Sequence, residues 1–417
     1  MVDMNLLQPD PHRPFRWLYL DLNAYFASVE EQERAELRGR PVGVVQVAAD
    51  NACVIAASYE AKRFGVRTGT LVYEARALCP ELELVEARHR LYVEYHERIL
   101  TAVETVVPVE KVCSIDEMRA RLLETEAGEA EAVRVAKRVK RAIKTLVGKC
   151  LTCSIGLAPN PFLAKIATEL QKPDGLVHLR PEELEERLAD WKLTDFPGIN
   201  RRMAVRLNLS GVYTVRQLLR SDEQSLRKAF GGVVGARWYH LLRGRDLPDS
   251  ETKRRTLGHS HVLPPEFRSR DGSYQVMLRL LEKAAARLRR EGLAARGIAF
   301  KVRARGEGWK QEKRLDATQD TLKFIETLQR AWPKNAMERP TQVSVTLFDL
   351  FPAGQMTLSL LAADNRGGRL AHAVDRVNSR FGKHKILPAA LMAAKETAPE
   401  RIAFTKATLF DEGNTAA

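Results

Sequence analysis

The sequence has no long hydrophobic run and few cysteines, and both shortages narrow the kinds of protein it can encode. No stretch approaches the roughly 20 apolar residues of a membrane-spanning helix, and the N-terminus lacks the basic start and apolar centre of a signal peptide. We therefore expect a soluble, cytoplasmic protein. The 5 cysteines are odd in number and scattered, which indicates reduced thiols rather than a disulfide framework. Without a second pair or a nearby histidine, the C-x-x-C of Cys150 and Cys153 predicts buried thiols rather than a zinc or redox site.

Acidic residues are also scarce relative to basic ones. The chain has 53 Asp plus Glu against 67 Lys plus Arg, which gives a net charge of +14. That excess predicts a polyanionic partner, although charge alone does not separate DNA from RNA or an acidic membrane surface. With 417 residues, 45% of them hydrophobic, and only 19 Pro and 25 Gly, the chain can fill several cores. About two to four domains are expected.

Strand-like and helix-like segments alternate over the first part of the chain. The apolar run from Trp17 to Leu20 predicts a strand, and Ala24, Ala27 and Glu30 are spaced as in a helix. The alternation continues to about Pro181, which favours an α/β or α+β core with helices stacked against one sheet. Short helices follow it.

A polar, basic and proline-punctuated segment at 244–264 is typical of an exposed tether between domains. Beyond it, a helical pattern at 272–292 and two β runs at 297–305 and 341–350 predict a smaller α+β domain.

Three acidic residues stand where strands are predicted. Asp21 ends one strand, and Asp116 and Glu117 lie within the strand-like run from Val112 to Ala120. A buried carboxylate is costly unless a cation or several donors compensate it. If the two strands are neighbours, the three carboxylates meet at one edge of the sheet, where hard oxygen ligands suit the two Mg²⁺ ions of an in-line phosphoryl transfer. The competing interpretation is a solvated strand end with Asp21 as a helix N-cap.

Basic and aromatic residues elsewhere weaken that alternative. Tyr59, Lys62 and Arg63 share one short segment, and Lys172 ends a predicted helix. Near a divalent-metal site, such groups can hold a triphosphate by charge-assisted hydrogen bonds. Each of them taken alone is more often a surface residue.

Five motifs occur in an order that resembles the Y-family, or translesion, DNA polymerases. They are DLNAYFASVE, ASYEAKRFGVRTGT, SIDE, CSIGLAPNPFLAKIATELQKPDGL and FPGINRRMAVRLNLSGVYTVRQL. The resemblance spans Trp17 to about Leu360 and implies an α+β fold, the right-hand polymerase. The implied parts are a palm with a ferredoxin-like sheet (1–37 and 73–180), small fingers (38–72), a helical thumb with a helix-hairpin-helix (181–245), a linker (246–258), a DNA-binding little finger (259–362) and a C-terminal tail (363–417).

The resemblance also implies catalytic roles. Asp21, Asp116 and Glu117 match the family's metal-binding carboxylates, and Leu22 matches the residue whose backbone carbonyl joins the metal ligands. Phe26 matches the aromatic steric gate, whose ring under the incoming sugar leaves no room for a 2′-hydroxyl.

Triphosphate binding falls to Tyr59, Lys62 and Lys172 by the same resemblance. The chain departs from the family at several points. Lys62 replaces the commoner Arg and loses its two-pronged donor, and Asn23 replaces a frequent Asp. The largest departure is Met118–Arg121, where the family usually has an aromatic residue and then Leu-Asp. The two arginines of this segment either contact nucleic acid or form a solvated face. Because the segment follows Glu117 directly, the departure puts a normal catalytic rate in doubt.

Two further segments are predicted to bind DNA. The turn at Gly198 resembles a helix-hairpin-helix that binds phosphate through backbone N–H groups. Asn200 replaces the family's second turn glycine, and we expect it to tolerate left-handed backbone angles. Alternation along 299–305 places Lys301, Arg303 and Arg305 on one strand face that can lie along a DNA backbone. The alternatives are an ordinary helical pair and a merely solvated face.

The segment QMTLSL resembles the short peptide by which bacterial replication proteins bind a sliding clamp. Its anchors would be Gln355, Met356, Leu358 and Leu360, in an extended peptide that fills a hydrophobic pocket. The competing interpretation is an edge strand of the small domain. A second candidate, ATLF at 407–410, lacks the glutamine.

The resemblance thus implies a template-directed, low-fidelity DNA polymerase that copies past damaged bases. It would transfer a nucleotide from a dNTP to a primer 3′-hydroxyl with two Mg²⁺ ions, Mn²⁺ being the other candidate. Its expected partners are primer-template DNA, dNTP and a bacterial sliding clamp, with no membrane, and the expected active form is a monomer. The main alternative is a non-catalytic accessory protein of the same fold that binds DNA and clamp; a cyclase or other nucleotidyl transferase with a palm-like sheet is a weaker one.

Overall fold

The computed structural model describes residues 14–47, 49–50, 52–249, 254–305, 308–333, 339–357, 366–382 and 385–394. The chain divides into two compact units, the first extending through Asp249 and the second beginning at Ser250. This division falls inside the segment predicted as a linker, 246–258. Within the described ranges, every helix is too short or too polar to span a membrane.

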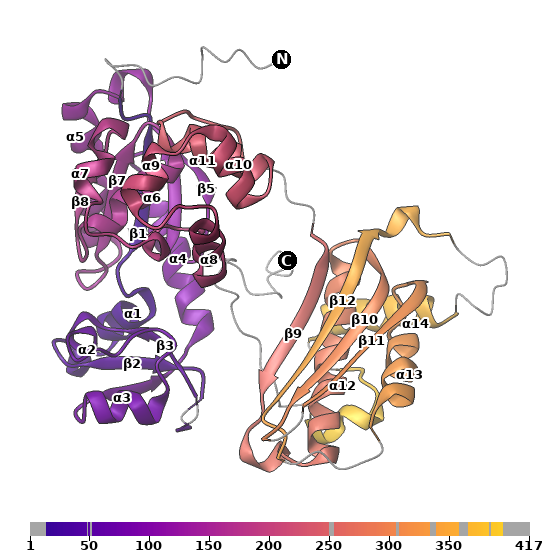
Figure 1. Cartoon of the computed structure of the whole chain (residues 1–417). Helices are drawn as coiled ribbons and strands as arrows, with labels where there is room; N and C mark the ends of the chain where they lie inside the picture. Colours follow the sequence, from indigo (N-terminus) through magenta and orange to yellow (C-terminus); the bar gives the residue numbers. More distant parts are fainter. Residues whose placement is uncertain are drawn as a thin grey trace. The chain divides into compact units, whose positions relative to one another are not determined.

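A five-stranded sheet forms the centre of the first unit (Figure 1). Its central strand pairs antiparallel with a neighbour on each side, and Asp21 lies directly opposite Glu117. In spatial order the strands are β5 (Val109–Val112), β6 (Glu117–Arg121), β1 (Trp17–Leu22), β7 (Cys153–Ala158) and β8 (Leu176–His178).

Helices cover both faces of this sheet, and the two-residue period of β1 decides which side chain faces which helix. Leu18, Leu20 and Leu22 join one core with α4 (His89–Glu104) and α5 (Glu129–Leu146). Trp17 and Tyr19 join the other core with α6 (Pro161–Leu170). By the same alternation, Asp21 lies on the α6 side.

The strand predicted from Val112 to Ala120 is wrong. β5 ends at Val112, β6 begins at Glu117, and the residues between them form the turn of a hairpin. The backbone N–H groups of Cys113 and Ser114 both donate to the Glu117 carbonyl, at 2.9 and 3.1 Å. A polar serine and aspartate can satisfy backbone groups in such a turn, where a strand interior would bury them.

A smaller three-stranded sheet has the order β3 (Val54–Ala57), β2 (Val42–Val45), β4 (Glu83–Glu86). Its own core includes Val72 and Ala75 from α3 and Cys79, the residue that follows this helix. The predicted end of the fingers at residue 72 is therefore too early, because α3 and β4 pack with β2 and β3. The helices near this sheet are α1 (Tyr25–Glu33), η2 (Ala35–Leu37), α2 (Tyr59–Arg63) and α3 (Val72–Leu78).

Short helices complete the first unit, as the sequence pattern predicts. Phe196, Phe230 and Trp238 are at the centre of their core, and the Phe230 and Trp238 rings stack 4.8 Å apart. The elements are η3 (Glu124–Glu126), η4 (Pro181–Glu183), α7 (Leu184–Arg187), η5 (Leu193–Asp195), α8 (Arg201–Leu209), α9 (Val215–Arg220), α10 (Glu223–Phe230) and α11 (Val233–Leu242).

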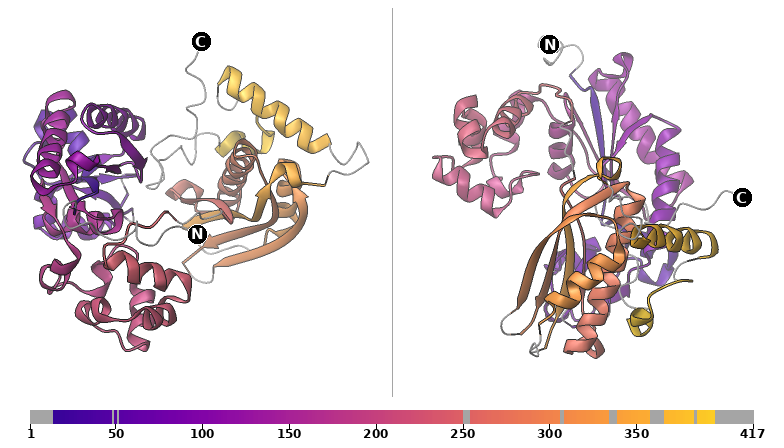
Figure 2. Two further views of the ribbon diagram at one scale, coloured as in Figure 1. Left: turned by 90° about the horizontal axis from the view of Figure 1, so that it is seen from above. Right: turned by 90° about the vertical axis from the view of Figure 1, so that its right-hand side faces the viewer.

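The second unit is a four-stranded antiparallel sheet with two helices against one face (Figure 2). Ile298, Phe300 and Val302 point into the core beneath the helices, while Lys301 and Arg303 are exposed. The elements are β9 (Thr256–Val262), η6 (Pro265–Phe267), α12 (Arg270–Arg290), β10 (Leu293–Arg303), β11 (Trp309–Thr318), α13 (Thr321–Ala331), β12 (Gln342–Pro352) and η7 (Ala353–Gln355), and the sheet order is β11-β10-β12-β9.

The predicted end of this domain at residue 362 is wrong, because part of the expected tail packs in its core. α14 (Arg366–Phe381) carries Asp375, whose carboxylate accepts two hydrogen bonds from the buried Arg289, at 2.6 and 2.9 Å. Leu391 in η8 (Ala389–Ala394) is 1% exposed and belongs to the same core.

Candidate active site

A pocket of about 350 Å³ lies in the first unit between the end of the five-stranded sheet and the smaller sheet. Every predicted metal, gate and triphosphate residue lines it. They are Asp21, Leu22, Phe26, Tyr59, Lys62, Asp116, Glu117 and Lys172. Residues far apart in the sequence therefore meet in one place, because β1 pairs with β6 and α1 and α2 close the pocket from the smaller sheet.

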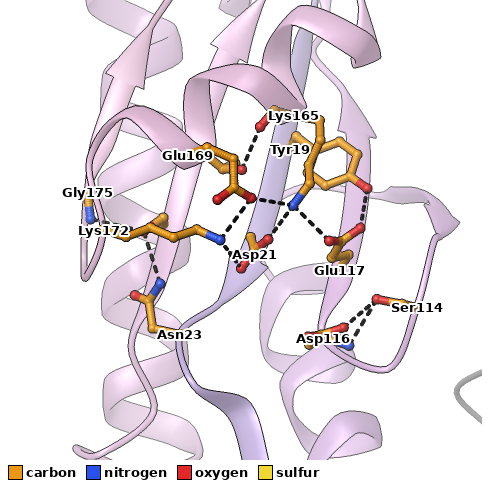
Figure 3. A network of polar contacts seen from close by, with 12 residues as sticks. Tyr19, Asp21, Asn23, Ser114, Asp116, Glu117, Lys165, Glu169, Lys172 and Gly175 are labelled. Atoms are coloured by element: carbon orange, nitrogen blue, oxygen red, sulfur yellow. Dashed lines mark hydrogen bonds and ion pairs between the residues drawn. The ribbon is translucent and has the colours of Figure 1, made fainter. Parts of the chain in front are cut away.

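Two lysines on or just after α6 neutralise the carboxylate of Asp21. Lys165 Nζ donates to Asp21 Oδ2 at 2.5 Å, and Lys172 Nζ donates to Asp21 Oδ1 at 3.0 Å. Both ammonium groups also donate to Glu169 Oε1 at 2.9 Å. Lys165 further pairs with Glu117 at 2.7 Å, so one cation joins three anions (Figure 3).

The electrostatics of Glu117 and Asp116 differ. Burial alone would raise the pKa of Glu117, but Lys165 outweighs it and lowers the pKa. Burial raises the pKa of Asp116, and the Asp21 and Glu117 carboxylates raise it further. The Asp116 carboxylate accepts a hydrogen bond from the Ser114 hydroxyl at 2.5 Å, and no described lysine or arginine forms an ion pair with it.

The donor atoms of the pocket fit a hard divalent cation. Three carboxylates and the backbone of Leu22 offer oxygen only, which suits Mg²⁺ or Mn²⁺, and Asp116 is an anion with no described cation partner. In the arrangement shown, no three His, Cys, Asp or Glu side chains of the described residues stand close enough to hold an ion. Figure 3 shows Lys165 between Asp21 and Glu117, with Asp116 turned to Ser114.

Phe26 and Tyr59 form the apolar side of the pocket. The Phe26 ring is 5% exposed and stacks on Tyr92, with ring centroids 4.3 Å apart. Lys62 Nζ lies 4.1 Å from the centre of the Tyr59 ring. Burial raises the pKa of Tyr59 to about 12, and burial together with Lys172 lowers the pKa of Lys62.

Asn23 has a structural task that an aspartate would not fulfil. Its Nδ2 donates to Ser154 Oγ at 3.1 Å, while its Oδ1 accepts from the Asp174 backbone N–H at 2.8 Å. An amide both donates and accepts, whereas an ionised carboxylate only accepts. The side chain thus links β1 to the loop that carries Lys172.

Lys165, Glu169 and Tyr19 are functional candidates that the sequence prediction missed. The i, i+4 spacing of Lys165 and Glu169 on a predicted helix that ends near Lys172 was the available signal. The departure at Met118–Arg121 does not enter the pocket: its arginines lie over the Trp17 ring, 5.1 and 4.7 Å from its centre.

The predicted DNA-binding turn exists, but its geometry differs from the expectation for Asn200. Gly198 has a φ of 97°, whereas Asn200 has an extended backbone with φ −84°. Asn200 is instead the N-cap of α8, and its side chain accepts from Met203 N at 2.9 Å. The turn therefore needs one glycine rather than two.

The remaining predicted residues belong to the second unit. Lys301 and Arg303 are exposed on β10, but Arg305 lies beyond the end of that strand. Gln355 ends the 3-10 turn η7 rather than an extended peptide, and Met356 follows it. Leu358, Leu360 and the ATLF segment lie outside the described residues.

Comparisons with known proteins match both units. A model of the impB/mucB/samB family matches residues 20–169, and a model of that family's C-terminal domain matches residues 254–360. The DNA polymerase IV of Moorella thermoacetica is 34% identical over 88% of this chain and 94% of its own length. That of Pelotomaculum thermopropionicum is 31% identical over 92% of this chain and 97% of its own. A solved chimeric Y-family DNA polymerase, 24% identical, has a similar fold, with a TM-score of 0.64 over 81% of this chain and 99% of that one.

Proposed function

The chain belongs to the Y-family DNA polymerases, the impB/mucB/samB family, and from this premise we propose that it extends a DNA primer past damaged template bases by two-metal catalysis. It is a DNA-directed DNA polymerase, and the predicted α+β, right-hand polymerase fold is confirmed. The observation that supports the proposed mechanism best is the pocket itself. It gathers three carboxylates on the sheet side and Tyr59, Lys62 and Lys172 around them.

The proposed reaction is the attack of a primer 3′-hydroxyl on the α-phosphate of a dNTP, with release of pyrophosphate. Asp21, Asp116, Glu117 and the Leu22 carbonyl would hold two Mg²⁺ ions, with Mn²⁺ as the alternative. When bound, such ions neutralise the charge on the attacking and leaving oxygens.

The other residues of the pocket bind and orient the nucleotide. The ammonium groups of Lys62 and Lys172 would hold the triphosphate by charge-assisted hydrogen bonds. The stacked Phe26 ring would pack beneath the sugar and exclude a 2′-hydroxyl.

Asp116→Asn tests the catalytic assignment in a primer-extension assay with Mg²⁺ and dNTPs. The substitution keeps the shape of the side chain and removes one anionic oxygen donor, so we expect a loss of at least about a hundredfold in rate. Asp174→Asn removes a nearby exposed carboxylate that pairs with Lys140 at 2.8 Å and is the matched control. Extension by Asp116→Asn at the wild-type rate would instead favour a non-catalytic DNA-binding protein.

For DNA binding we propose two surfaces, one in each unit. Backbone N–H groups between Gly198 and the start of α8 would bind one phosphate, and Lys301 and Arg303 would bind others along the exposed face of β10. Phosphate contacts are salt-dependent: log K falls as log salt rises, and each contact removed should make this negative slope shallower by about 0.9. Arg305 is a weaker candidate, since it lies beyond the strand.

The proposed partner besides DNA and dNTP is a bacterial sliding clamp, bound through Gln355, Met356, Leu358 and Leu360. We propose that the protein works in the cytoplasm as a monomer. Replacing Gln355 and Leu358 by alanine should abolish stimulation of synthesis by the clamp while leaving clamp-free synthesis unchanged. Full stimulation of that double variant would remove this site from consideration.

A further inference from the structure

Lys165 has no part in the mechanism proposed above, yet its ammonium lies among the carboxylates. Its Nζ is 2.5 Å from Asp21 Oδ2, 2.7 Å from Glu117 Oε1 and 2.9 Å from Glu169 Oε1. Only 15% of the side chain is exposed. The Tyr19 hydroxyl donates to the other Glu117 oxygen at 2.7 Å, so the Glu117 carboxylate is held from two sides (Figure 3).

The position of Lys165 is determined by how α6 packs on the sheet. Asn160 caps the helix, its Oδ1 accepting from Leu163 N at 2.8 Å. Gly156 on β7 allows a close approach, because a Cβ there would overlap the carbonyl oxygen of Ala164. Since Ala164 precedes Lys165, this contact holds the ammonium over the neighbouring strand, which carries Asp21.

The lysine stays charged in this environment. Burial alone would lower the pKa of Lys165, but the three surrounding carboxylates outweigh it and raise the pKa. Removing one member of a buried, paired set leaves the opposite charges without compensation, which is costly. With three carboxylates within 2.9 Å of its Nζ, Lys165 contributes a positive charge to this pocket at neutral pH.

We propose that Lys165 is a positioning residue that acts as an internal counter-ion. Its ammonium holds the Asp21 and Glu117 carboxylates together until a divalent cation enters, binds their oxygens and displaces the ammonium. A cation ligated by these two carboxylates needs oxygens that the ammonium now contacts, and like charges at such short range repel strongly. Glu169, already bonded to Lys165, offers the acceptor to which the ammonium can withdraw. This inference rests on the proposed function, in which the same carboxylates bind metal.

The exchange predicts that removing the lysine tightens metal binding. Lys165→Met keeps most of the length and the unbranched shape of the side chain but not its charge, so an entering ion would no longer displace a cation. We expect the Kd for Mn²⁺, measured on the full-length protein by electron paramagnetic resonance of the free ion, to fall at least about tenfold. Without metal, the same variant should unfold at a lower temperature than wild type, and added Mn²⁺ should raise its melting temperature by more.

Lys172→Met is the matched control, because it removes the same charge from the same pocket. Lys172 contacts Asp21 and Glu169 but no oxygen of Glu117, so it does not bridge the two proposed metal ligands, Asp21 and Glu117. We expect a smaller gain in Mn²⁺ affinity than for Lys165→Met, whereas Lys165→Arg, which keeps the charge, should bind Mn²⁺ no more tightly than wild type. Lys140→Met, at a lysine that pairs with Asp174, should leave the affinity unchanged.

A measurement on the wild-type protein covers the case in which Lys165→Met does not fold. Acetic anhydride should modify Lys165 faster with saturating Mn²⁺ than without it, because the displaced ammonium loses its contacts with Asp21 and Glu117 and keeps only Glu169. Lys140 should react at the same rate with and without Mn²⁺. Mass spectrometry of the digested protein reads both sites.

Two results would overturn the counter-ion proposal. One is equal Mn²⁺ affinity in wild type and Lys165→Met, and the other is an equal gain in Mn²⁺ affinity in Lys165→Met and Lys172→Met. An Asp116→Asn variant separates this failure from failure of the proposed function. If Asp116→Asn binds Mn²⁺ as tightly as wild type, the ion is not held by these carboxylates, and the metal site itself is wrong. If Asp116→Asn no longer binds Mn²⁺ while Lys165→Met binds it no more tightly than wild type, the metal site is supported and only the displacement of Lys165 is wrong.

Discussion

Arg119 donates two hydrogen bonds to the carboxylate of Asp249, from Nη1 to Oδ1 at 3.0 Å and from Nη2 to Oδ2 at 2.8 Å. Lys111 adds a third at 2.6 Å. The Arg119 side chain is 12% exposed and lies over the Trp17 ring. Asp249 is the last residue of the long N-terminal segment that forms the first unit. The arginine that departs from the family pattern therefore fastens the chain to β6 at the point where it leaves this unit.

Releasing this contact should free the segment that follows. Asp249→Asn removes the charge that Arg119 and Lys111 share, and we expect trypsin to cleave after Lys253 or Arg254 several times faster than in wild type.

The hydrogen bonds from Arg119 lower the pKa of Asp249 to about 2. A lowered carboxyl pKa stabilises the fold above the ordinary value of about 3.9, and the effect is lost as the pH falls toward 2. The ratio of cleavage rates between Asp249→Asn and wild type, each pair measured at one pH, should therefore not change between pH 6 and 8.

Arg121→Gln is the control for that experiment. Arg121 pairs with Asp246 at 2.9 Å and not with Asp249, so the chain should stay fastened at its last residue. If Asp249→Asn is cleaved no faster than Arg121→Gln, the contact does not restrain the segment.

The sequence was informative where the order of apolar and charged residues along one strand decides where a side chain lies. The apolar run from Trp17 to Leu20 placed Asp21 at the end of a strand, and the pairing of β1 with β6 brings it opposite Glu117, as expected if the two strands are neighbours. Lys165 was missed because its reach depends on how closely α6 approaches β7, which no periodicity encodes. Arg119 was left between two interpretations because its partner, Asp249, is 130 residues away and exposed ion pairs leave no pattern in either segment.

The predicted end of the second domain at residue 362 was wrong for a related reason. The predicted boundary at residue 362 left α14 outside the domain, and among the described side chains of α14 only Ala371, 7% exposed, is buried. What attaches it is the pair of Arg289 and Asp375, a tertiary contact between two charged residues. Charged residues are ordinarily on the surface, so composition pointed away from a packed helix.

Phe26→Ala should weaken discrimination between deoxyribonucleotides and ribonucleotides. The ring is held flat against Tyr92, so it cannot easily move aside for a 2′-hydroxyl, and truncation removes the obstacle. We expect the ratio of kcat/KM for dNTP over rNTP to fall at least about tenfold, which corresponds to about 1.4 kcal/mol of lost discrimination. Steady-state primer extension with each nucleotide measures it. Phe64→Ala, at an exposed aromatic of the same unit, is the control, and an unchanged ratio for Phe26→Ala would mean that Phe26 is not the gate.

Gly156→Ala should move α6, which carries Lys165 of the candidate active site, away from the sheet. The added methyl would overlap the Ala164 carbonyl oxygen and lie 2.8 Å from the Ala167 side chain, so α6 must shift away from the sheet. We expect a loss of about 1–3 kcal/mol in the free energy of unfolding, measured by urea titration. Gly128→Ala is the matched control, since a Cβ there meets nothing within 4 Å. Equal stability of the two variants would contradict the close packing of α6.

His259 should make the second unit sensitive to mild acid. Burial, together with the positive charges of Lys283, Arg287 and Arg290 on α12, lowers its pKa to about 4. The unfolded chain, with a histidine pKa near about 6.5, then binds the proton more tightly than the folded one, so stability is full above pH 6.5 and falls as the pH drops from there toward 4.

The expected loss between pH 7 and 5 is up to about 2 kcal/mol, because one group contributes at most about 1.4 kcal/mol per pH unit below 6.5. Native-state hydrogen exchange of the β12 amides, which pair with β9 around His259, measures it in the full-length protein. His259→Gln carries no titrating group and should remove most of this fall. A decline of equal size in wild type and His259→Gln would assign the acid sensitivity to other groups, because the histidine is then not what the unfolded chain protonates in that range.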